Sequence, residues 1–102
     1  MMNYIRDQLP DEELLAQLAE EATELAHAAL KMRRAMDGKN PTPVRISEAW
    51  AKLQEEVADV LLSLQVLDIN TNDQEYRHTM DTKLDRWAGR LRQAENGEDL
   101  ND

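Results

Sequence analysis

Residues 55–61 of this chain read Glu-Glu-Val-Ala-Asp-Val-Leu, and a related acidic stretch, Glu-Glu-Ala-Thr-Glu-Leu, occupies residues 20–25. In each stretch two acids stand three positions apart: Glu56 and Asp59 in the first, Glu21 and Glu24 in the second. Residues at positions i and i+3 are neighbours on one face of a helix. Each stretch therefore predicts a helix that presents two carboxylates side by side.

Apolar residues flank both acidic stretches at helical spacing. At about 100° per residue, one apolar stripe falls just beside Glu21: Leu14, Leu18, Ala22, Leu25, Ala29, Met32 and Met36. A matching stripe falls on the same side of Glu56: Trp50, Leu53, Val57, Val60, Leu61, Leu64 and Leu67. The two helices therefore carry their acids at the same edge of the same kind of apolar face, and antiparallel packing would bring four carboxylates together.

Four converging carboxylates predict a bound cation. Like charges at close range repel each other, and burial raises the free-energy cost of keeping them charged. A divalent cation would remove this conflict. Because the ligands are all oxygen atoms, a hard cation such as Mg²⁺ or Mn²⁺ suits them best.

The composition favours an all-α protein of one domain. The 102 residues contain no Phe and no Cys, and Gly and Pro number three each. Without Cys, neither a disulfide scaffold nor a thiolate metal site can form. The formal net charge of −9 argues against general nucleic-acid binding, which needs a basic footprint. No secretory signal and no apolar run of roughly 20 residues is visible, so we expect a cytoplasmic protein without a membrane span.

Turn and capping residues divide the chain into four predicted helices, over residues 1–8, 10–36, 48–69 and 73–95. Gly38 is predicted to end the second helix. Ser47 and Asn72 are predicted to cap the two helices that follow them. Two prolines make residues 37–47 a loop, and residues 96–102 are predicted to form an acidic tail outside the core.

The last two predicted helices carry further apolar and basic patterns. The helix over 48–69 has a second apolar strip, which predicts a subunit contact or packing against the last helix: Leu62, Val66 and Ile69. The last helix has an apolar stripe of its own: Tyr76, Met80, Leu84, Trp87 and Leu91. Basic residues run beside that stripe: Lys83, Arg86 and Arg90. Since so small a domain buries a modest part of its surface, we expect a partner subunit to complete part of the core.

Taken together, these residues resemble the MazG-like all-α nucleoside triphosphate pyrophosphohydrolases. The resemblance covers about residues 10–92 and depends on the two acidic motifs, in order, followed by a helix with Lys83 and Arg86. It implies a compact helical bundle that forms a homodimer or homotetramer. It also implies hydrolysis of a (d)NTP between the α and β phosphates, giving the monophosphate and pyrophosphate. It also implies that Lys83 and Arg86 contact the triphosphate and that four acids bind Mg²⁺ and serve catalysis: Glu21, Glu24, Glu56 and Asp59.

The chain departs from the family's compact forms in one respect. The stretch between Glu24 and Glu56 is long, and the extra length lies in the loop over 37–47. That loop could be a lid, a subunit contact or a spacer.

Other interpretations of the same residues stay open. The acidic stretches alone could be solvated helix faces, in a helical interaction module without activity or in a relative that binds nucleotides without turnover. We expect Trp50 and Trp87 in the core, although either could stack on a base, and Tyr4, Asn40 and Arg45 could reach one. Glu24-x-x-His27 matches half of a di-iron signature, but Leu62 stands at the corresponding position after Asp59.

Overall fold

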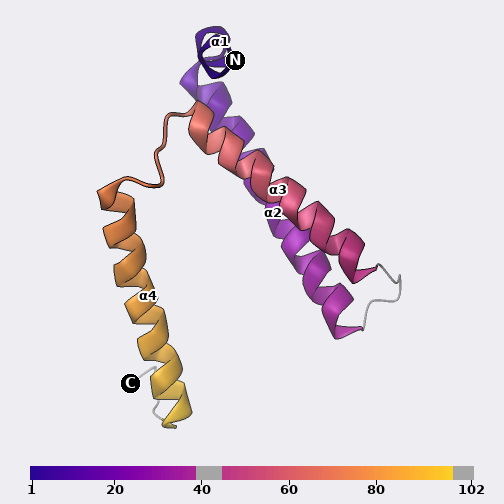
Figure 1. Ribbon diagram of the computed structural model, residues 1–102, viewed down its shortest axis with the longest axis vertical. Coiled ribbons are helices and arrows are strands. Elements are labelled where there is room, and N and C mark those ends of the chain that lie inside the picture. Colours follow the sequence, from indigo (N-terminus) through magenta and orange to yellow (C-terminus); the bar gives the residue numbers. More distant parts are fainter. Residues whose placement is uncertain (39–44, 98–102) are drawn as a thin grey trace. The chain divides into compact units, whose positions relative to one another are not determined.

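The computed structural model describes residues 1–38 and 45–97, and these residues form four helices and no strand (Figure 1). The helices are α1 (Met2–Gln8), α2 (Asp11–Asp37), α3 (Ile46–Val66) and α4 (Gln74–Glu95). The predicted all-α class is confirmed. The predicted loop and tail lie largely outside the described residues, at positions 39–44 and 98–102. By their contacts, the residues group into two compact units, Met1–Ile69 and Asn70–Asp102.

The boundaries of α2 follow from the residues at its two ends. Pro10 is the N-cap, with φ −70° and ψ 159°, and three acids fill the first turn, where they complement the positive end of the helix dipole. Gly38 follows the helix in the left-handed region at φ 69°, which glycine adopts without steric cost. The predicted end of this helix is therefore confirmed.

The predicted caps of the next two helices are wrong. Arg45 is the N-cap of α3, so Ser47 already lies inside the helix, which begins two residues earlier than expected and ends at Val66. Asp73 is the N-cap of α4. The backbone N–H of Asn72 donates instead to Oδ1 of Asn70, 3.0 Å away. The Asn70 side chain therefore stabilises a local turn just before α4, as asparagine commonly does in turns.

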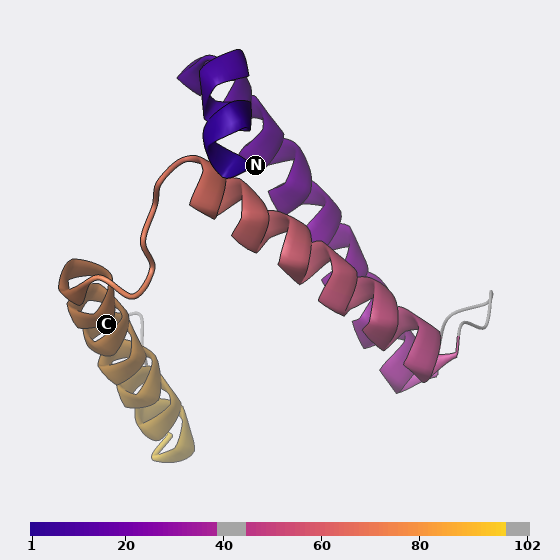
Figure 2. The ribbon, with the colours of Figure 1, turned by 45° about the horizontal axis from the view of Figure 1, so that its top comes forward.

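Helices α2 and α3 run side by side in opposite directions (Figures 1 and 2). The least exposed residues of α2 recur three and four positions apart: Leu14, Leu18, Glu21, Leu25, Ala28, Met32 and Ala35. Among the buried and half-buried residues of α3 and its C-cap, one set has nearly the same spacing: Ala49, Leu53, Glu56, Val60, Ser63 and Leu67. A mean spacing of 3.5 residues is typical of helices that coil around each other. We call the line along which these two sets meet the seam.

The seam corrects the predicted apolar stripes. Ala22, Ala29 and Met36 are exposed, while Glu21 lies in the seam rather than at its edge. In α3, Trp50 is 52% exposed, so its predicted place in the core is wrong. An ideal helix drifts by about 20° per heptad from a 3.5-residue repeat. A straight helical wheel therefore misplaces residues by more at each turn along a helix as long as α2.

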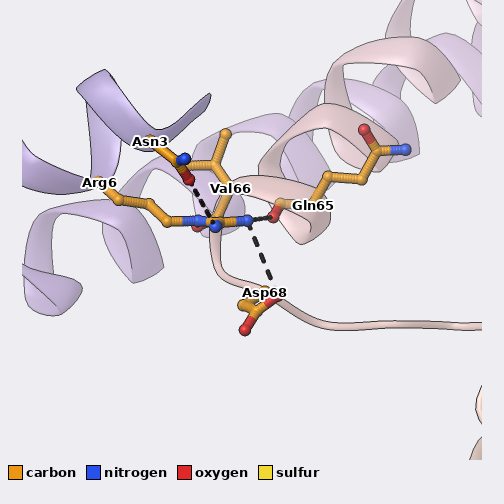
Figure 3. Close-up of polar contacts among 5 residues, drawn as sticks. All are labelled: Asn3, Arg6, Gln65, Val66 and Asp68. Carbon is orange, nitrogen blue, oxygen red and sulfur yellow. Dashed lines mark hydrogen bonds and ion pairs between the residues drawn. The ribbon is translucent and has the colours of Figure 1, made fainter. Parts of the chain in front are cut away.

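Helix α1 packs against the end of α3 through Arg6 (Figure 3). The Arg6 guanidinium donates to the backbone carbonyls of Gln65 and Val66, each at 2.7 Å. Val66 is 6% exposed. Part of the strip predicted to contact another subunit or the last helix is therefore buried within the first unit, near α1.

Helix α4 is the only helix described in the second unit, and none of its residues is buried. Its apolar side chains are exposed, including Leu84 at 61% and Trp87 at 64%. Glycine in the left-handed region follows the helix at position 97, with φ 73°. None of the described helices is both long enough and apolar enough to cross a membrane.

Candidate metal centre

Three of the predicted acids come together between α2 and α3. Glu21 projects from α2, and Glu56 and Asp59 project from α3. One carboxylate oxygen of each lies within 4.8 Å of the others. Glu21 and Glu56 meet because both occupy seam positions, and Asp59 joins them because it stands one turn after Glu56 on α3.

Burial differs among the three carboxylates. Glu56 is 4% exposed, while Glu21 and Asp59 are half-buried. A buried carboxylate is costly unless it is paired. The buried Glu56 carboxylate therefore requires a partner close to it.

Lys52 supplies the partner for Glu56. Its Nζ lies 2.8 Å from Oε1 of Glu56 and 3.7 Å from Oε2 of Glu55. The hydrogen bond to Glu56 is the main reason that the pKa of Lys52 is raised above its usual 10.5. Sequence reasoning missed this residue, although its spacing of four residues from Glu56 is the signal that identifies such helical ion pairs.

One ammonium group does not balance three carboxylates. The pKa of Glu21 is raised above its usual 4.5, first by partial burial and then by the negative charges of Asp59 and Glu56. Gln17 opposes this shift, because its Nε2 donates to Oε1 of Glu21 at 2.8 Å. The folded protein thus holds Glu21 where its charged form is disfavoured.

These residues fit a hard divalent cation. The group offers oxygen ligands only, all from carboxylates, and it carries excess negative charge at a partly buried point. Hard cations such as Mg²⁺ prefer this donor set. Glu21, Glu56 and Asp59 are the residues that would hold the ion.

Glu24 lies outside the three-carboxylate group. It is exposed on α2, one turn beyond Glu21, and its charge contributes to raising the pKa of Lys52. Its predicted role as a fourth ligand stays a prediction. His27 is also exposed on α2 and does not belong to the group.

The predicted phosphate-binding residues, Lys83 and Arg86, lie on α4 and are exposed. Because α4 belongs to the second unit, their predicted contact with a triphosphate stays a prediction. Of the residues that we expected to reach a base, Tyr4 is 64% exposed, Arg45 is exposed at the start of α3, and Asn40 lies outside the described residues.

A cavity of about 200 Å³ adjoins two of the three carboxylates. Glu21 and Asp59 form part of its lining. Apolar side chains form much of the remainder: Ile5, Leu9, Leu14, Leu62 and Val66. From the first helix, the sequence indicated only Tyr4 for contact with a base, and it did not indicate that Ile5 lines this cavity.

Comparison with protein families identifies a domain that covers most of the chain. The model described as the MazG nucleotide pyrophosphohydrolase domain matches residues 10–91. This segment includes the three carboxylates, Lys52 and the basic residues of α4, whereas α1 precedes it. Comparison with curated proteins and with solved structures gives no match.

Proposed function

We propose that this chain, which belongs to the MazG nucleotide pyrophosphohydrolase family, is a Mg²⁺-dependent enzyme that cleaves a nucleoside or deoxynucleoside triphosphate between its α and β phosphates. The products are the nucleoside monophosphate and pyrophosphate. The observation that carries the proposal is the convergence of Glu21, Glu56 and Asp59 at the seam between α2 and α3.

The three carboxylates act as the anchor for the metal and hence for the substrate. A bound divalent cation neutralises phosphate charge and lowers the pKa of a bound water. The protein's contribution is to hold the ligand oxygens close together before the substrate arrives. Packing along the seam fixes the backbone of both helices, so Glu56 and Asp59 keep their positions relative to Glu21.

Lys52 has two roles in this proposal. It keeps the buried Glu56 paired, and it places an ammonium group beside the carboxylates, where a triphosphate would lie. Lysine binds phosphate oxygens as a point charge. Lys83 and Arg86 supply further positive charge to the developing phosphate oxygens.

The active form that we propose is a homodimer or homotetramer. The apolar stripe of α4 has no second helix to cover it among the described residues of its own unit. A single helix gains most of its stability by burying such a face. A second copy of the chain would supply the missing surface.

Release of pyrophosphate from a panel of NTPs and dNTPs, with and without Mg²⁺, tests the proposed reaction. Glu56→Gln should abolish metal-dependent release and also the rise in melting temperature caused by Mg²⁺. Glu48→Gln, the same change at an exposed position of α3, is the matched control and should alter neither. No release by the folded wild-type protein would contradict the proposal and favour a nucleotide-binding relative or an interaction module.

A further inference from the structure

The C-terminal end of α3 has the hydrogen bonds of a Schellman motif, a common way for a helix to end. The N–H of Asp68 donates to the carbonyl of Gln65 at 3.0 Å, and the N–H of Ile69 donates to the carbonyl of Leu64 at 2.9 Å. In this motif, the position that Asp68 occupies is left-handed and favours glycine. Within residues 1–38 and 45–97, Asp68 is the one residue other than glycine with a positive φ, at 63°.

Arg6 of α1 binds the carbonyl groups of this turn. Its Nη2 donates to the carbonyl of Gln65 and its Nε to the carbonyl of Val66, each at 2.7 Å (Figure 3). Carbonyls in the last turn of a helix lack partners within the helix, and a cation there complements the negative end of the helix dipole. One guanidinium group therefore satisfies two carbonyls at the point where α3 ends.

Two further groups surround the guanidinium. Nη1 donates to Oδ1 of Asn3 at 3.3 Å, one turn earlier on α1. Nη2 lies 3.8 Å from Oδ1 of Asp68, whose side chain is 88% exposed. Because exposed ion pairs stabilise proteins little, the two short hydrogen bonds to the carbonyls are the main attachment. We call the contact between Arg6 and residues 65–68 the latch.

The short length of α1 makes the latch important for its attachment to α3. The helix has only seven residues, and none of them is buried. Isolated helices shorter than about 12 residues are marginal in water. Without the Arg6 hydrogen bonds, we expect α1 to leave the end of α3 and the turn at Asp68 to lose its outside support.

The latch lies where the chain passes from one unit to the other. The first unit ends at Ile69 and the second begins at Asn70. Only residues 67–73 separate α3 from α4. The conformation of the turn at Asp68 therefore sets the direction in which the chain leaves α3.

We propose that Arg6 is a positioning residue that acts through α4. The latch fixes the turn at Asp68 and thereby restricts how α4 presents Lys83 and Arg86 to a bound triphosphate. The effect on triphosphate binding rests on the proposed function, whereas the latch itself does not. Arg6 precedes residues 10–91, which the family model matches, so family membership does not account for the latch.

Hydrogen exchange measured by NMR tests the latch without a substrate. In Arg6→Ala the amides of Asp68 and Ile69 should exchange about tenfold faster or more, the scale of losing a hydrogen bond to a charged group. Arg6→Lys should restore part of the protection, because an ammonium group can bind one carbonyl but lacks the planar fork. The amide of Val60, in the seam, should exchange as in wild type. Arg34→Ala, an exposed change on α2, is the matched control and should alter none of these amides.

Two results would overturn the latch. The first is unchanged exchange of the Asp68 and Ile69 amides in Arg6→Ala. The second is equal acceleration at Val60, which would show that Arg6 stabilises the whole unit rather than the turn that ends α3.

Binding of triphosphates that cannot be cleaved tests the positioning role. The α,β-methylene analogues of ATP, GTP, CTP, UTP and dTTP replace the bond that the proposed reaction breaks, and calorimetry with Mg²⁺ measures their affinity. For the analogue that binds most tightly, Arg6→Ala should weaken binding by about tenfold, the scale of losing one charge-assisted contact. The rise in melting temperature caused by Mg²⁺ should persist, because α2 and α3 supply the carboxylates.

A double-mutant cycle shows whether Arg6 acts through α4. In protein that already carries Lys83→Gln and Arg86→Gln, Arg6→Ala should weaken binding much less, because the basic groups that it positions are absent. In protein that carries Arg77→Gln, an exposed change on the same helix, Arg6→Ala should keep its full effect. Equal losses in all three backgrounds would overturn the positioning role.

The outcomes separate this inference from the proposed reaction. If the analogues bind and the losses are coupled, the inference stands even where no pyrophosphate is released. If no analogue binds to the wild type, the positioning role falls together with the proposed function, and hydrogen exchange still decides the latch. If exchange in Arg6→Ala is unchanged, the latch is wrong even where triphosphates are hydrolysed.

Discussion

Lys52 and Glu56 lie four positions apart on α3 and form an ion pair at 2.8 Å. Their side chains differ in environment, because Glu56 is buried and Lys52 is half-exposed. Removing the partner of a buried charge destabilises a protein more than the pair itself stabilises it. The pair therefore gives the buried Glu56 a hydrogen-bonded counterion at the seam.

We predict that Lys52→Gln lowers the melting temperature of the metal-free protein, because it leaves the buried Glu56 unpaired. It should also reduce kcat/KM for the triphosphate by roughly a hundredfold, the usual scale for losing one group that stabilises transition-state charge. Thermal denaturation in EDTA and steady-state assays measure the two effects. Lys31→Gln, an exposed change on α2, should produce neither, and an unchanged kcat/KM in Lys52→Gln would rule out the proposed contact with phosphate.

The raised pKa of Glu21 predicts how stability depends on pH. Between 4.5 and the raised value, the folded protein binds more protons at Glu21 than the unfolded chain does. The free energy of unfolding contributed by this group therefore falls as pH rises through that window. Urea titrations of metal-free protein between about pH 4 and pH 7 should show a smaller fall for Glu21→Gln than for wild type. Glu20→Gln, at the exposed neighbour, should behave as wild type, and an equal fall in Glu21→Gln would contradict the assignment.

For individual residues, the sequence predicted which acids converge better than it predicted which side chains surround them. The i,i+3 spacing of Glu56 and Asp59, and the pairing with Glu21, are sufficient to predict three of the residues that converge. Lys52 was missed because an ion pair within one helix is common on solvated faces. Only the burial of Glu56 distinguishes this pair, and burial depends on which face of α3 meets α2.

The elements α2 and α3 show why the faces were harder to predict than the helices. Turn residues at Pro10 and Gly38 are strong local signals, and the helix between them has nearly the predicted bounds. The buried face depends instead on how two helices coil around each other over their whole length. The 3.5-residue spacing of the seam brings Glu21 inward and leaves Trp50 and Met36 exposed.

Two glycines should respond in opposite ways to substitution by alanine. Gly38 has φ +69° after α2, where a Cβ is strained, so Gly38→Ala should destabilise by about 1 kcal/mol. Gly89 lies within α4, and no heavy atom beyond its own helix backbone and chain neighbours lies within 4 Å of an added Cβ, so Gly89→Ala should stabilise by about 1 kcal/mol. Urea unfolding measures both changes. Destabilisation by Gly89→Ala would show that another surface packs closely on that position.

The assembly of the whole molecule depends on which surface covers the apolar stripe of α4. This helix forms the second unit, and its apolar stripe is exposed there, with Met80 at 62% and Leu84 at 61%. The sequence could predict the stripe from its periodicity. It could not predict the covering surface, because an amphipathic pattern reports that a face is buried and not what buries it.

We predict that Leu84→Lys lowers the molar mass of the protein in solution, because a charge in the middle of the stripe opposes association. Analytical ultracentrifugation at several concentrations measures the change from dimer or tetramer toward monomer. Thr82→Lys places the same charge nearly opposite on α4 and is the matched control. If wild-type protein is a monomer, or if Leu84→Lys leaves the mass of the oligomer unchanged, α4 does not form the subunit interface.

The Lys52–Glu56 pair also has a consequence for how the protein is handled. Its positive charge comes from the same helix as the buried carboxylate, so part of the acidic cluster is neutralised before any ion arrives. Small metal domains whose folding free energy comes mainly from the metal unfold when a chelator removes it. Dialysis against EDTA should therefore leave this protein helical. Adding Mg²⁺ back should restore its activity without a refolding step.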